Sequence, residues 1–478
     1  MKDTMVLYTA MGPSHLVPMV ELAKLFLSNN LSVAIVTSDL PYKPGSMAQT
    51  VSRISPANPS ISFHILPALE WANYANISIE ARFFASLRDN NRNLLDFLTS
   101  FTKTNFVRAI VFDFFSSASL DVAQQLLIPA YIFTAFGASD VAVFLHVTEL
   151  HKNNTVNWKN MGKDLVNFPG IPPIIASDLP MIILDRESDS YKIIIETLPN
   201  LVRASGILIN SFESLEPKAV ATLTEGLCVP SCKMPPVYCI GPLISQPEQK
   251  EGEGRHESLA WLDLQPKKSV VFLCFGTYGA FRSDQIKQIA VGLENSRQRF
   301  LWVIKSVREQ ENMYFSKSIT SADLIKLMPE GFLDRTQGKG MVIQSWVPQL
   351  QVLQHEAVGG FVTHCGWNSI LEAVTAGVPM ICWPLYAEQR LNKLVVVEEI
   401  KIGAVMEGYD EDIVNADQVE AKVRWLMESE GGRIIKERVA MLKDKVAEAL
   451  REDGSSSKAL MQFMTDLRGT NSEGKCKS

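Results

Sequence analysis

Short apolar runs alternate with helical patterns twice along the 478 residues, and this alternation constrains the fold more than any other feature. In the first half, an apolar run at 5–10 leads through a loop to a helical pattern at 16–27 and a second apolar run at 31–37. The second half starts again with an apolar run at 269–275. Strands that alternate with helices predict parallel sheets covered by helices. We therefore expect an α/β protein with two doubly wound, Rossmann-like domains that face a central cleft.

A charged, glycine-containing stretch, SQPEQKEGEGRH at 245–256, separates the two halves and contains no apolar anchor. Such composition is typical of an interdomain linker. We expect an N-terminal domain at 1–244, a linker at 245–258, a C-terminal domain at 259–455, and a final helix with a polar tail at 456–478.

Three further expectations concern segments of the first half. The apolar spacing at 81–101 predicts one long helix, whereas 38–61 is rich in Pro, Ser and Asn and shows no regular pattern until a strand at 62–66. The tract at 153–180 predicts a long loop over a surface cleft.

The composition excludes several classes of protein. A net charge of −6 without a basic stripe argues against nucleic-acid binding. Apolar segments are too short to cross a bilayer, and the first residues indicate a strand rather than a signal peptide. The seven cysteines lack zinc-ligand spacing, so we expect free thiols in a reducing compartment, which favours the cytoplasm.

The stretch at 346–389 contains the clearest chemical signal. A strand at 360–363 runs into the turn His-Cys-Gly-Trp-Asn-Ser at 364–369 and then into a helical pattern at 370–376. The start of a helix exposes backbone N–H groups and a positive dipole end, which suit a phosphate. Glu372 would repel phosphate, so we expect it to bind a sugar hydroxyl. The stretch therefore predicts a site for a sugar attached to phosphate.

The same forty-four residues resemble the C-terminal signature box of plant family 1 UDP-sugar glycosyltransferases. The resemblance rests on the opening Trp-Val-Pro-Gln at 346–349, the centre at 364–369 and the closing Glu-Gln at 388–389. It implies a GT-B fold, with an acceptor-binding N-terminal domain, a UDP-sugar-binding C-terminal domain and a last helix that returns to the N-terminal domain.

The resemblance also implies roles for individual residues in binding the donor. Trp346 would stack on uracil, the backbone of Val347 would pair with its edge, and Gln349 and Glu372 would bind the ribose. His364, Asn368 and Ser369 would bind the diphosphate. Glu388 and Gln389 would bind the hydroxyls of the sugar, and Trp367 would belong to the same wall of the donor site. Thr277, in a tight loop after the strand at 269–275, offers a hydroxyl near phosphate, and Thr134 matches a sugar-facing hydroxyl in relatives.

Two residues at predicted strand ends are candidates for catalysis. His15 lies in the first loop, and Asp113 is the one acid in the apolar run at 109–114, where a strand should end. A phenol is mostly protonated at neutral pH, so a general base assists its attack on the sugar. Asp113 would orient the imidazole and stabilise its protonated form, in agreement with the family pattern. Asp113 could instead cap the following turn, and Asp121 is a rival partner within a helical pattern.

The expected reaction is a single displacement with inversion, which gives a β-glucoside from UDP-glucose. No cofactor is expected beyond this donor substrate. No Asp-x-Asp signature occurs in a suitable loop, so no metal is expected either. Glu388, where many family members carry Asp, leaves galactose or xylose open as the donor sugar.

The sequence constrains the identity of the acceptor less than that of the donor. Phenylalanines could line a pocket for a flat phenol, and core packing explains many of them equally well; they are Phe83, Phe84, Phe114, Phe115, Phe136 and Phe144. The tracts GLCVPSCKMPPVYCIGPLI and FPGIPPI resemble a subgroup that acts on chalcones, dihydrochalcones and flavonoids, small phenols of plant secondary metabolism. C-glycosylation of the same acceptors is an alternative.

Three other classes of function stay open at the level of sequence. They are a UDP-sugar epimerase or hydrolase, an NAD-dependent oxidoreductase, and a non-catalytic sugar-nucleotide sensor. The oxidoreductase is disfavoured because Gly12 is not part of a G-x-G-x-x-G fingerprint. We expect a monomer with a UDP-sugar and a small phenol as its partners, without nucleic acid or membrane insertion.

Overall fold

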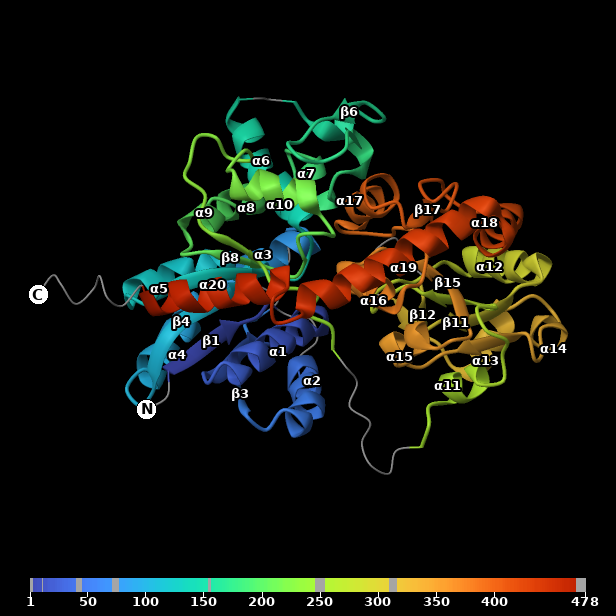
Figure 1. The fold of residues 1–478 in the computed structure, drawn as a ribbon, viewed down its shortest axis with the longest axis horizontal. Coiled ribbons are helices and arrows are strands. Elements are labelled where there is room, and N and C mark those ends of the chain that lie inside the picture. Colours follow the sequence, from blue (N-terminus) through green and yellow to red (C-terminus); the bar gives the residue numbers. More distant parts are fainter. Residues whose placement is uncertain are drawn as a thin grey trace, which may run out of the picture. The chain divides into compact units, whose positions relative to one another are not determined.

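The computed structural model describes residues 3–10, 12–39, 45–70, 77–153, 156–245, 254–308 and 316–469. They group into two compact units, the first comprising Met1–Ser245 with Glu448–Ser478 and the second Gln246–Ala447. Most of the predicted linker at 245–258 lies outside the described residues. Figure 1 labels the elements of both units.

The first unit is built on a seven-stranded parallel sheet with the order β3-β2-β1-β4-β5-β8-β9. Its strands are β1 Asp3–Tyr8, β2 Ser32–Ser38, β3 Ile61–Leu66, β4 Phe106–Asp113, β5 Ala130–Thr134, β8 Ile207–Ile209 and β9 Val237–Cys239. The chain order reverses between β1 and β4, which are neighbours in register from Asp3 opposite Phe106 to Tyr8 opposite Phe112. Ligands of doubly wound sheets bind at the carboxyl ends of strands at such a reversal.

Helices surround this sheet, and the unit also contains a separate short antiparallel pair, β6 Leu165–Val166 and β7 Ile174–Ile175. The helices are α1 Pro13–Ser28, α2 Ser46–Ile54, α3 Ile79–Asp89, α4 Asn91–Phe101, α5 Leu120–Gln125, α6 Ala138–Asn153, α7 Met181–Leu184, α8 Asp189–Thr197, α9 Asn200–Arg203, α10 Pro217–Thr224 and α20 Ser455–Gly469.

The last helix completes the core of the first unit. Helix α20, at the red end of the colour scale in Figure 1, packs on β9. The Phe463 ring stacks on Phe26 of α1 at 5.6 Å and meets Tyr131 and Tyr238 edge-on at 4.9 and 5.4 Å. The Tyr238 hydroxyl donates to Asp466 at 2.6 Å. Residues near the start and near the end of the sequence therefore share one core in the first unit.

The second unit repeats the plan with a six-stranded parallel sheet in the order β14-β11-β10-β15-β16-β17. Its strands are β10 Val270–Cys274, β11 Arg299–Val303, β14 Gly340–Ile343, β15 Val358–Thr363, β16 Met380–Cys382 and β17 Gly403–Val405. Strands β10 and β15 are buried along their whole lengths, as expected for central strands that helices cover on both faces. The order reverses between these two strands.

Helices and a second short antiparallel pair, β12 Ser306–Val307 and β13 Lys317–Ser318, complete the second unit. The helices are α11 Glu257–Leu262, α12 Ser283–Ser296, α13 Ser321–Leu327, α14 Phe332–Arg335, α15 Gln349–Gln354, α16 Trp367–Ala376, α17 Gln389–Leu394, α18 Ala416–Glu428 and α19 Glu430–Leu450, which ends beyond the boundary between the units.

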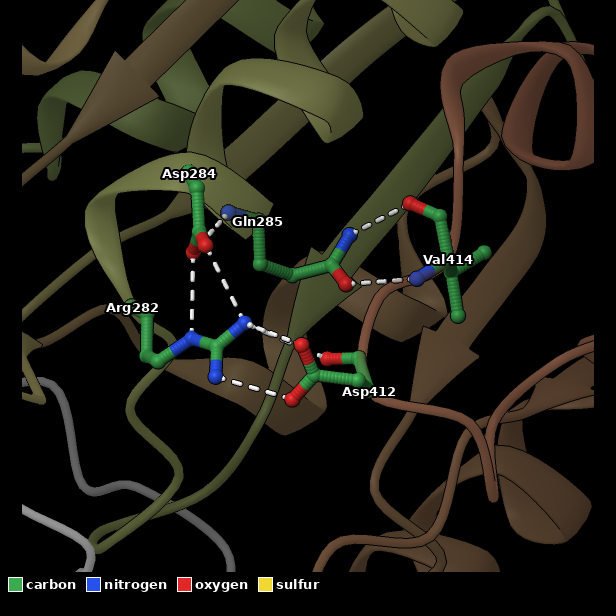
Figure 2. A network of polar contacts seen from close by, with 5 residues as sticks. All are labelled: Arg282, Asp284, Gln285, Asp412 and Val414. Atoms are coloured by element: carbon green, nitrogen blue, oxygen red, sulfur yellow. Dashed lines mark hydrogen bonds and ion pairs between the residues drawn. The ribbon is translucent and has the colours of Figure 1, made fainter.

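A polar network fastens the start of α12 to the segment that precedes α18 (Figure 2). The Arg282 guanidinium binds Asp284 and both carboxylate oxygens of Asp412. The Gln285 carboxamide donates to the carbonyl of Val414 and accepts from its N–H, both at 2.8 Å. The loop between β10 and α12 is therefore anchored where it enters α12.

Three expectations about local structure were wrong. The predicted helix at 81–101 is two helices, α3 and α4, because the buried Asn90 carboxamide turns inward and donates to Ser38 at 2.8 Å. The region at 38–61 contains helix α2, and the predicted loop at 153–180 contains the β6–β7 pair.

The sequence also led us to expect free cysteine thiols and no membrane-crossing segment. Within them, all six cysteines are free thiols, as expected, and Cys476 lies outside them. Among the helices so described, none has the length and apolar character needed to cross a bilayer.

Candidate functional site

The structure brings His15 and Asp113 together in the first unit. His15 is in the first turn of α1, directly after the carboxyl end of β1, and Asp113 is the last residue of the neighbouring strand β4. Nδ1 of the imidazole donates to Oδ2 of Asp113 at 2.9 Å. The carboxylate is buried, with 1% of its side chain exposed, whereas 23% of the imidazole is exposed. A buried carboxylate thus holds a partly accessible imidazole.

Asp113 performs both roles that the sequence left open for it. Oδ1 accepts the N–H of Phe115 at 2.9 Å and so caps the turn that follows β4, while Oδ2 holds His15. Because the turn fixes one oxygen, the direction of the other is also fixed. The rival Asp121 is 70% exposed and binds Arg203 at 2.7 Å.

The predicted acceptor aromatics form one cluster that touches the imidazole through Phe115, whose ring meets His15 edge-on at 5.1 Å. Phe84, Phe114 and Phe136 contact Phe115, and Phe144 packs against Phe114 and Phe136. Phe84, Phe114, Phe136 and Phe144 are buried, whereas Phe83 and Phe115 are partly exposed. The buried rings support Phe115, and Phe83 packs with Phe115 against Ala10 and Leu87.

Thr134, which the sequence assigned to the donor sugar, is the last residue of β5 and is fully buried. Its hydroxyl donates to the carbonyl of Phe136 at 3.3 Å. That bond shapes the turn that carries Phe136. A contact from Thr134 to a sugar stays a prediction.

In the second unit, His364 follows β15 directly and its imidazole lies between two glycines. A Cβ on Gly276 or on Gly366 would come within 2.5 Å of Nε2 of His364. Burial, together with a smaller contribution from the Lys305 ammonium, lowers the pKa of His364 to about 3. The ring is therefore neutral and held between two turns. Gly276 makes room for this ring.

The turn at 364–368 leads into α16, whose N-cap, Gly366, has no side chain to bind the exposed N–H groups. Two buried polar atoms at this end, Nδ1 of His364 and Oδ1 of Asn368, make no hydrogen bond within the described part of the chain. Buried polar atoms are usually paired, so this end of α16 is chemically unsatisfied. This is the end that the sequence predicted for a diphosphate.

Gln349, Ser369 and Glu372 form one buried cluster beside that turn. The Gln349 carboxamide donates to the Ser369 hydroxyl at 2.8 Å and to Oε2 of Glu372 at 2.6 Å. Burial raises the pKa of Glu372 to about 7, and the bond from Gln349 opposes this shift. A buried carboxylate with such a pKa favours a ligand that donates hydrogen bonds.

Trp346 has an unusually exposed indole for so large an apolar side chain, with 58% of its surface accessible. Its backbone carbonyl accepts Nε2–H of His256 at 3.1 Å, and the next residue, Val347, is buried. The indole is thus presented on a fixed backbone, as a stacking surface requires.

The remaining donor candidates follow the carboxyl ends of β10, β15 and β16. Thr277 is exposed in the loop after β10, and Trp367 is the buried first residue of α16. Gln389 is buried, and its Oε1 accepts the N–H groups of Leu385 and Tyr386 at 2.9 and 3.0 Å. Glu388, the N-cap residue of α17, is partly exposed. Gln389 therefore folds the loop that presents Glu388.

Comparison with known proteins identifies the family. The model of the family described as UDP-glucoronosyl and UDP-glucosyl transferase matches residues 228–439. UDP-glycosyltransferase 88F3 from Pyrus communis is 41% identical over 485 residues, which cover 98% of this chain and 100% of that protein. A phloretin 2'-O-glucosyltransferase from Malus domestica is 41% identical over 483 residues, with the same coverage of both chains. This chain belongs to the UDP-glycosyltransferase family.

Solved structures place the glycosyltransferase in the GT-B fold class, as the resemblance implied. A UDP-glucosyltransferase from Polygonum tinctorium, described as capable of glucosylating indoxyl and solved with 3,4-dichloroaniline, is 32% identical. The match has a TM-score of 0.87 and covers 98% of this chain and 99% of that chain.

Three residues beside the donor candidates of this glycosyltransferase were not found from its sequence. His256 holds the Trp346 carbonyl, and Asn392 donates to the carbonyl of Cys365 at 2.9 Å, where the chain has a left-handed φ of 65°. Lys305 donates to the carbonyl of Gly276 at 3.5 Å. Of the three, only Lys305 could have been found from the sequence. A charged residue at the end of an apolar run marks the carboxyl end of a strand, and Asp113 was found in this way.

Proposed function

We propose that this glycosyltransferase transfers glucose from UDP-glucose to a hydroxyl of a small phenol of the flavonoid, chalcone or dihydrochalcone type. The product would be a β-glucoside, formed with inversion. The observation that carries the proposal is the 2.9 Å bond between His15 and Asp113 next to the partly exposed ring of Phe115. The phloretin 2'-O-glucosyltransferase among the relatives supports the acceptor class.

His15 is the general base in this proposal. Because Nδ1–H donates to Asp113, the lone pair of the neutral ring is on Nε2, which takes the phenolic proton. The phenolate oxygen attacks the anomeric carbon from the face opposite UDP, which inverts its configuration. Asp113 then stabilises the imidazolium, and the bond from Phe115 N–H keeps the carboxylate in place.

The aromatic cluster supplies the acceptor surface. Phe83 and Phe115 are partly exposed, so we assign them to contact with a flat phenol. The buried Phe84, Phe114 and Phe136 support Phe115. Edge-to-face contacts between these rings keep the surface rigid. An apolar surface beside the base also excludes water, which favours transfer to a phenol over hydrolysis.

The second unit is the donor site in this proposal. Trp346 stacks on uracil, Gln349 and Glu372 bind the ribose, and the unsatisfied end of α16 with His364, Asn368 and Ser369 binds the diphosphate. Glu388, Gln389 and Trp367 face the sugar. Thr134 offers a further hydroxyl to the sugar, and Thr277 offers one to the phosphate. The short bond between Gln349 and Glu372 supports the ribose assignment, because a carboxylate oriented in this way accepts a ribose O–H.

We further infer that the reaction needs no metal and that the enzyme is a cytoplasmic monomer. The run Asp410-Glu411-Asp412 has Asp-x-Asp spacing, but Arg282 occupies the carboxylate of Asp412 (Figure 2). Within the described residues, no group of three or more His, Cys, Asp or Glu side chains could hold a metal ion. Full activity in EDTA and a monomeric mass in solution are the expected results.

The deciding experiment incubates the full chain with UDP-glucose and a panel of phenols, with UDP-galactose and UDP-xylose as competing donors. We expect one mole of UDP for each mole of an acid-labile β-glucoside. An acid-stable product would show C-glycosylation instead. UDP release without added phenol would favour a hydrolase, and consumption of NAD would favour an oxidoreductase.

A further inference from the structure

The residues assigned to the donor contain no positive charge. They include two carboxylates, Glu372 and Glu388, and one histidine, His364, whose burial lowers its pKa to about 3 and keeps it neutral. The end of α16 contributes only about half a charge. A diphosphate is anionic, and it gains a further negative charge when the sugar leaves it. The assigned set therefore lacks a cation.

Lys305 lies where such a cation is needed. It follows β11, the neighbour of β10, two residues after that strand ends. In a parallel sheet this places it at the same edge as the turn at Gly276, which follows β10, and the side chain of Lys305 reaches that turn. Nζ donates to the Gly276 carbonyl at 3.5 Å, and its charge contributes to lowering the pKa of His364.

Lys305 has no carboxylate partner among the described residues. Its one hydrogen bond, at 3.5 Å to a neutral carbonyl, is at the weak end of the range for such bonds. A partly buried ammonium with so little compensation is unusual unless an anion completes its surroundings. Lys305 is therefore available to an anionic ligand at the turn.

We propose that Lys305 binds the donor diphosphate and stabilises UDP as the leaving group. This inference rests on the proposed donor site. As the bond between the acceptor oxygen and the anomeric carbon forms, the bond from that carbon to the β-phosphate oxygen breaks. Its electron pair stays on the phosphate, and the phenolic proton goes to His15. Lys305 neutralises the charge that develops on the phosphate.

The alternative role for Lys305 is structural, because its bond to Gly276 could simply hold the turn. Ligands that differ only in phosphate separate the two roles. Uridine, UMP and UDP share the base and ribose, so a structural defect weakens all of them, whereas loss of a phosphate contact weakens only the phosphorylated ones. Binding of the three to the full-length protein, measured by calorimetry, is the test.

The variants are Lys305→Met, which keeps the apolar stem and removes the charge, and Lys305→Arg, which keeps the charge. Lys443→Met is a matched control, because Lys443 also donates at 3.5 Å to a backbone carbonyl, that of Ala376 at the opposite end of α16. It removes a lysine with the same kind of bond from the same unit without touching the turn.

We expect Lys305→Met to weaken UDP about 10- to 100-fold, the effect of losing a hydrogen bond to a charged group, and to leave uridine within about twofold. Lys305→Arg should recover most of the affinity, and Lys443→Met should bind as the wild type does. At saturating donor, kcat should fall in Lys305→Met.

Two outcomes would overturn the inference while leaving the proposed function intact. One is wild-type affinity of Lys305→Met for UDP, and the other is an equal loss for uridine and UDP. A wild-type protein that binds neither uridine nor UDP would instead overturn the donor site itself, and this inference with it.

Discussion

The imidazole of His364 occupies the space into which a side chain at Gly276 would project. A Cβ at 276 would lie 2.5 Å from Nε2, and the backbone there has a φ of 75°. Gly366 approaches the same atom equally closely without a positive φ. The orientation of a residue assigned to the diphosphate thus depends on two positions without a side chain.

Alanine at these glycines should lower affinity for UDP. Gly366→Ala introduces the clash alone, and Gly276→Ala adds a left-handed backbone that costs about 1 kcal/mol or more. We expect both variants to bind UDP at least tenfold more weakly, measured by calorimetry.

Gly338→Ala separates strain from clash. Gly338 has a φ of 74°, and no atom lies within 4 Å of its added Cβ. This variant should lose about 1 kcal/mol of unfolding free energy and bind UDP normally. Equal losses of UDP affinity at 338 and 276 would show that backbone strain, not contact with His364, is responsible.

The stability of the unliganded protein should fall as the pH rises from about 4.5 to about 7 because of Glu372. Burial raises its pKa to about 7, so the folded state holds a proton that the unfolded state has already released. Above pH 7, ionisation of the buried Glu372 lowers the free energy of unfolding by up to about 3 kcal/mol. Urea unfolding at pH 5 and pH 8 should show a smaller pH effect in Glu372→Gln than in the wild type.

Uridine should bind more tightly as the pH rises through about 7. Ribose hydroxyls donate more strongly to ionised Glu372 than to its protonated form, so binding favours ionisation and releases a proton. We expect about a tenfold gain in affinity between pH 6 and pH 8, measured with uridine because it has no phosphate to titrate. Glu372→Gln should bind weakly at all pH values, and an unchanged wild-type affinity would contradict the ribose assignment.

Loss of the base should affect turnover rather than donor binding. His15→Ala should lower kcat by about 10²- to 10⁴-fold, with little change in the Kd of UDP. Asp113→Asn should also lower kcat, because an amide has one acceptor oxygen and cannot accept from both Nδ1–H of His15 and the N–H of Phe115. In the wild type, the rate should fall at acidic pH as His15 is protonated. A flat pH profile, or transfer at wild-type rate in His15→Ala, would remove the base assignment.

The last helix should contribute strongly to the stability of the first unit. Phe463→Ala removes a fully buried ring and should cost about 3–5 kcal/mol. Met461→Ala, on an exposed part of the same helix, should change stability by less than about 0.5 kcal/mol. Uridine affinity, measured where both variants are folded, should not change. A small cost in Phe463→Ala would show that the core repacks without this ring.

Much of the fold was predictable because buried parallel strands appear as continuous apolar runs. The runs at 5–10 and 269–275 correspond to β1 and β10, and the resemblance implied the fold class. The break between α3 and α4 was not predictable, because it depends on Asn90 reaching Ser38, which is distant in sequence. Helix α2 was missed because Ser and Thr weaken its apolar pattern.

The sequence placed the candidate residues correctly at strand ends but could not give their partners. That Asp113 caps a turn and holds His15 at the same time is visible only in three dimensions. Asn392 was missed because its contact is to a backbone carbonyl, and backbone contacts leave no pattern in side-chain identity. The position of Lys305 after an apolar run was visible in the sequence, but its partner, the carbonyl of Gly276, was not.

Because Phe463, Met464 and Leu467 belong to the core that also contains Met5, Leu7 and Phe26, the first unit cannot finish folding until the ribosome has made residues 463–467, after the second unit. The second unit lies entirely between these two contributions and can form earlier. During synthesis, the aromatic surface that awaits Phe463 stays open to water, and this interval is when the nascent protein is most exposed to aggregation.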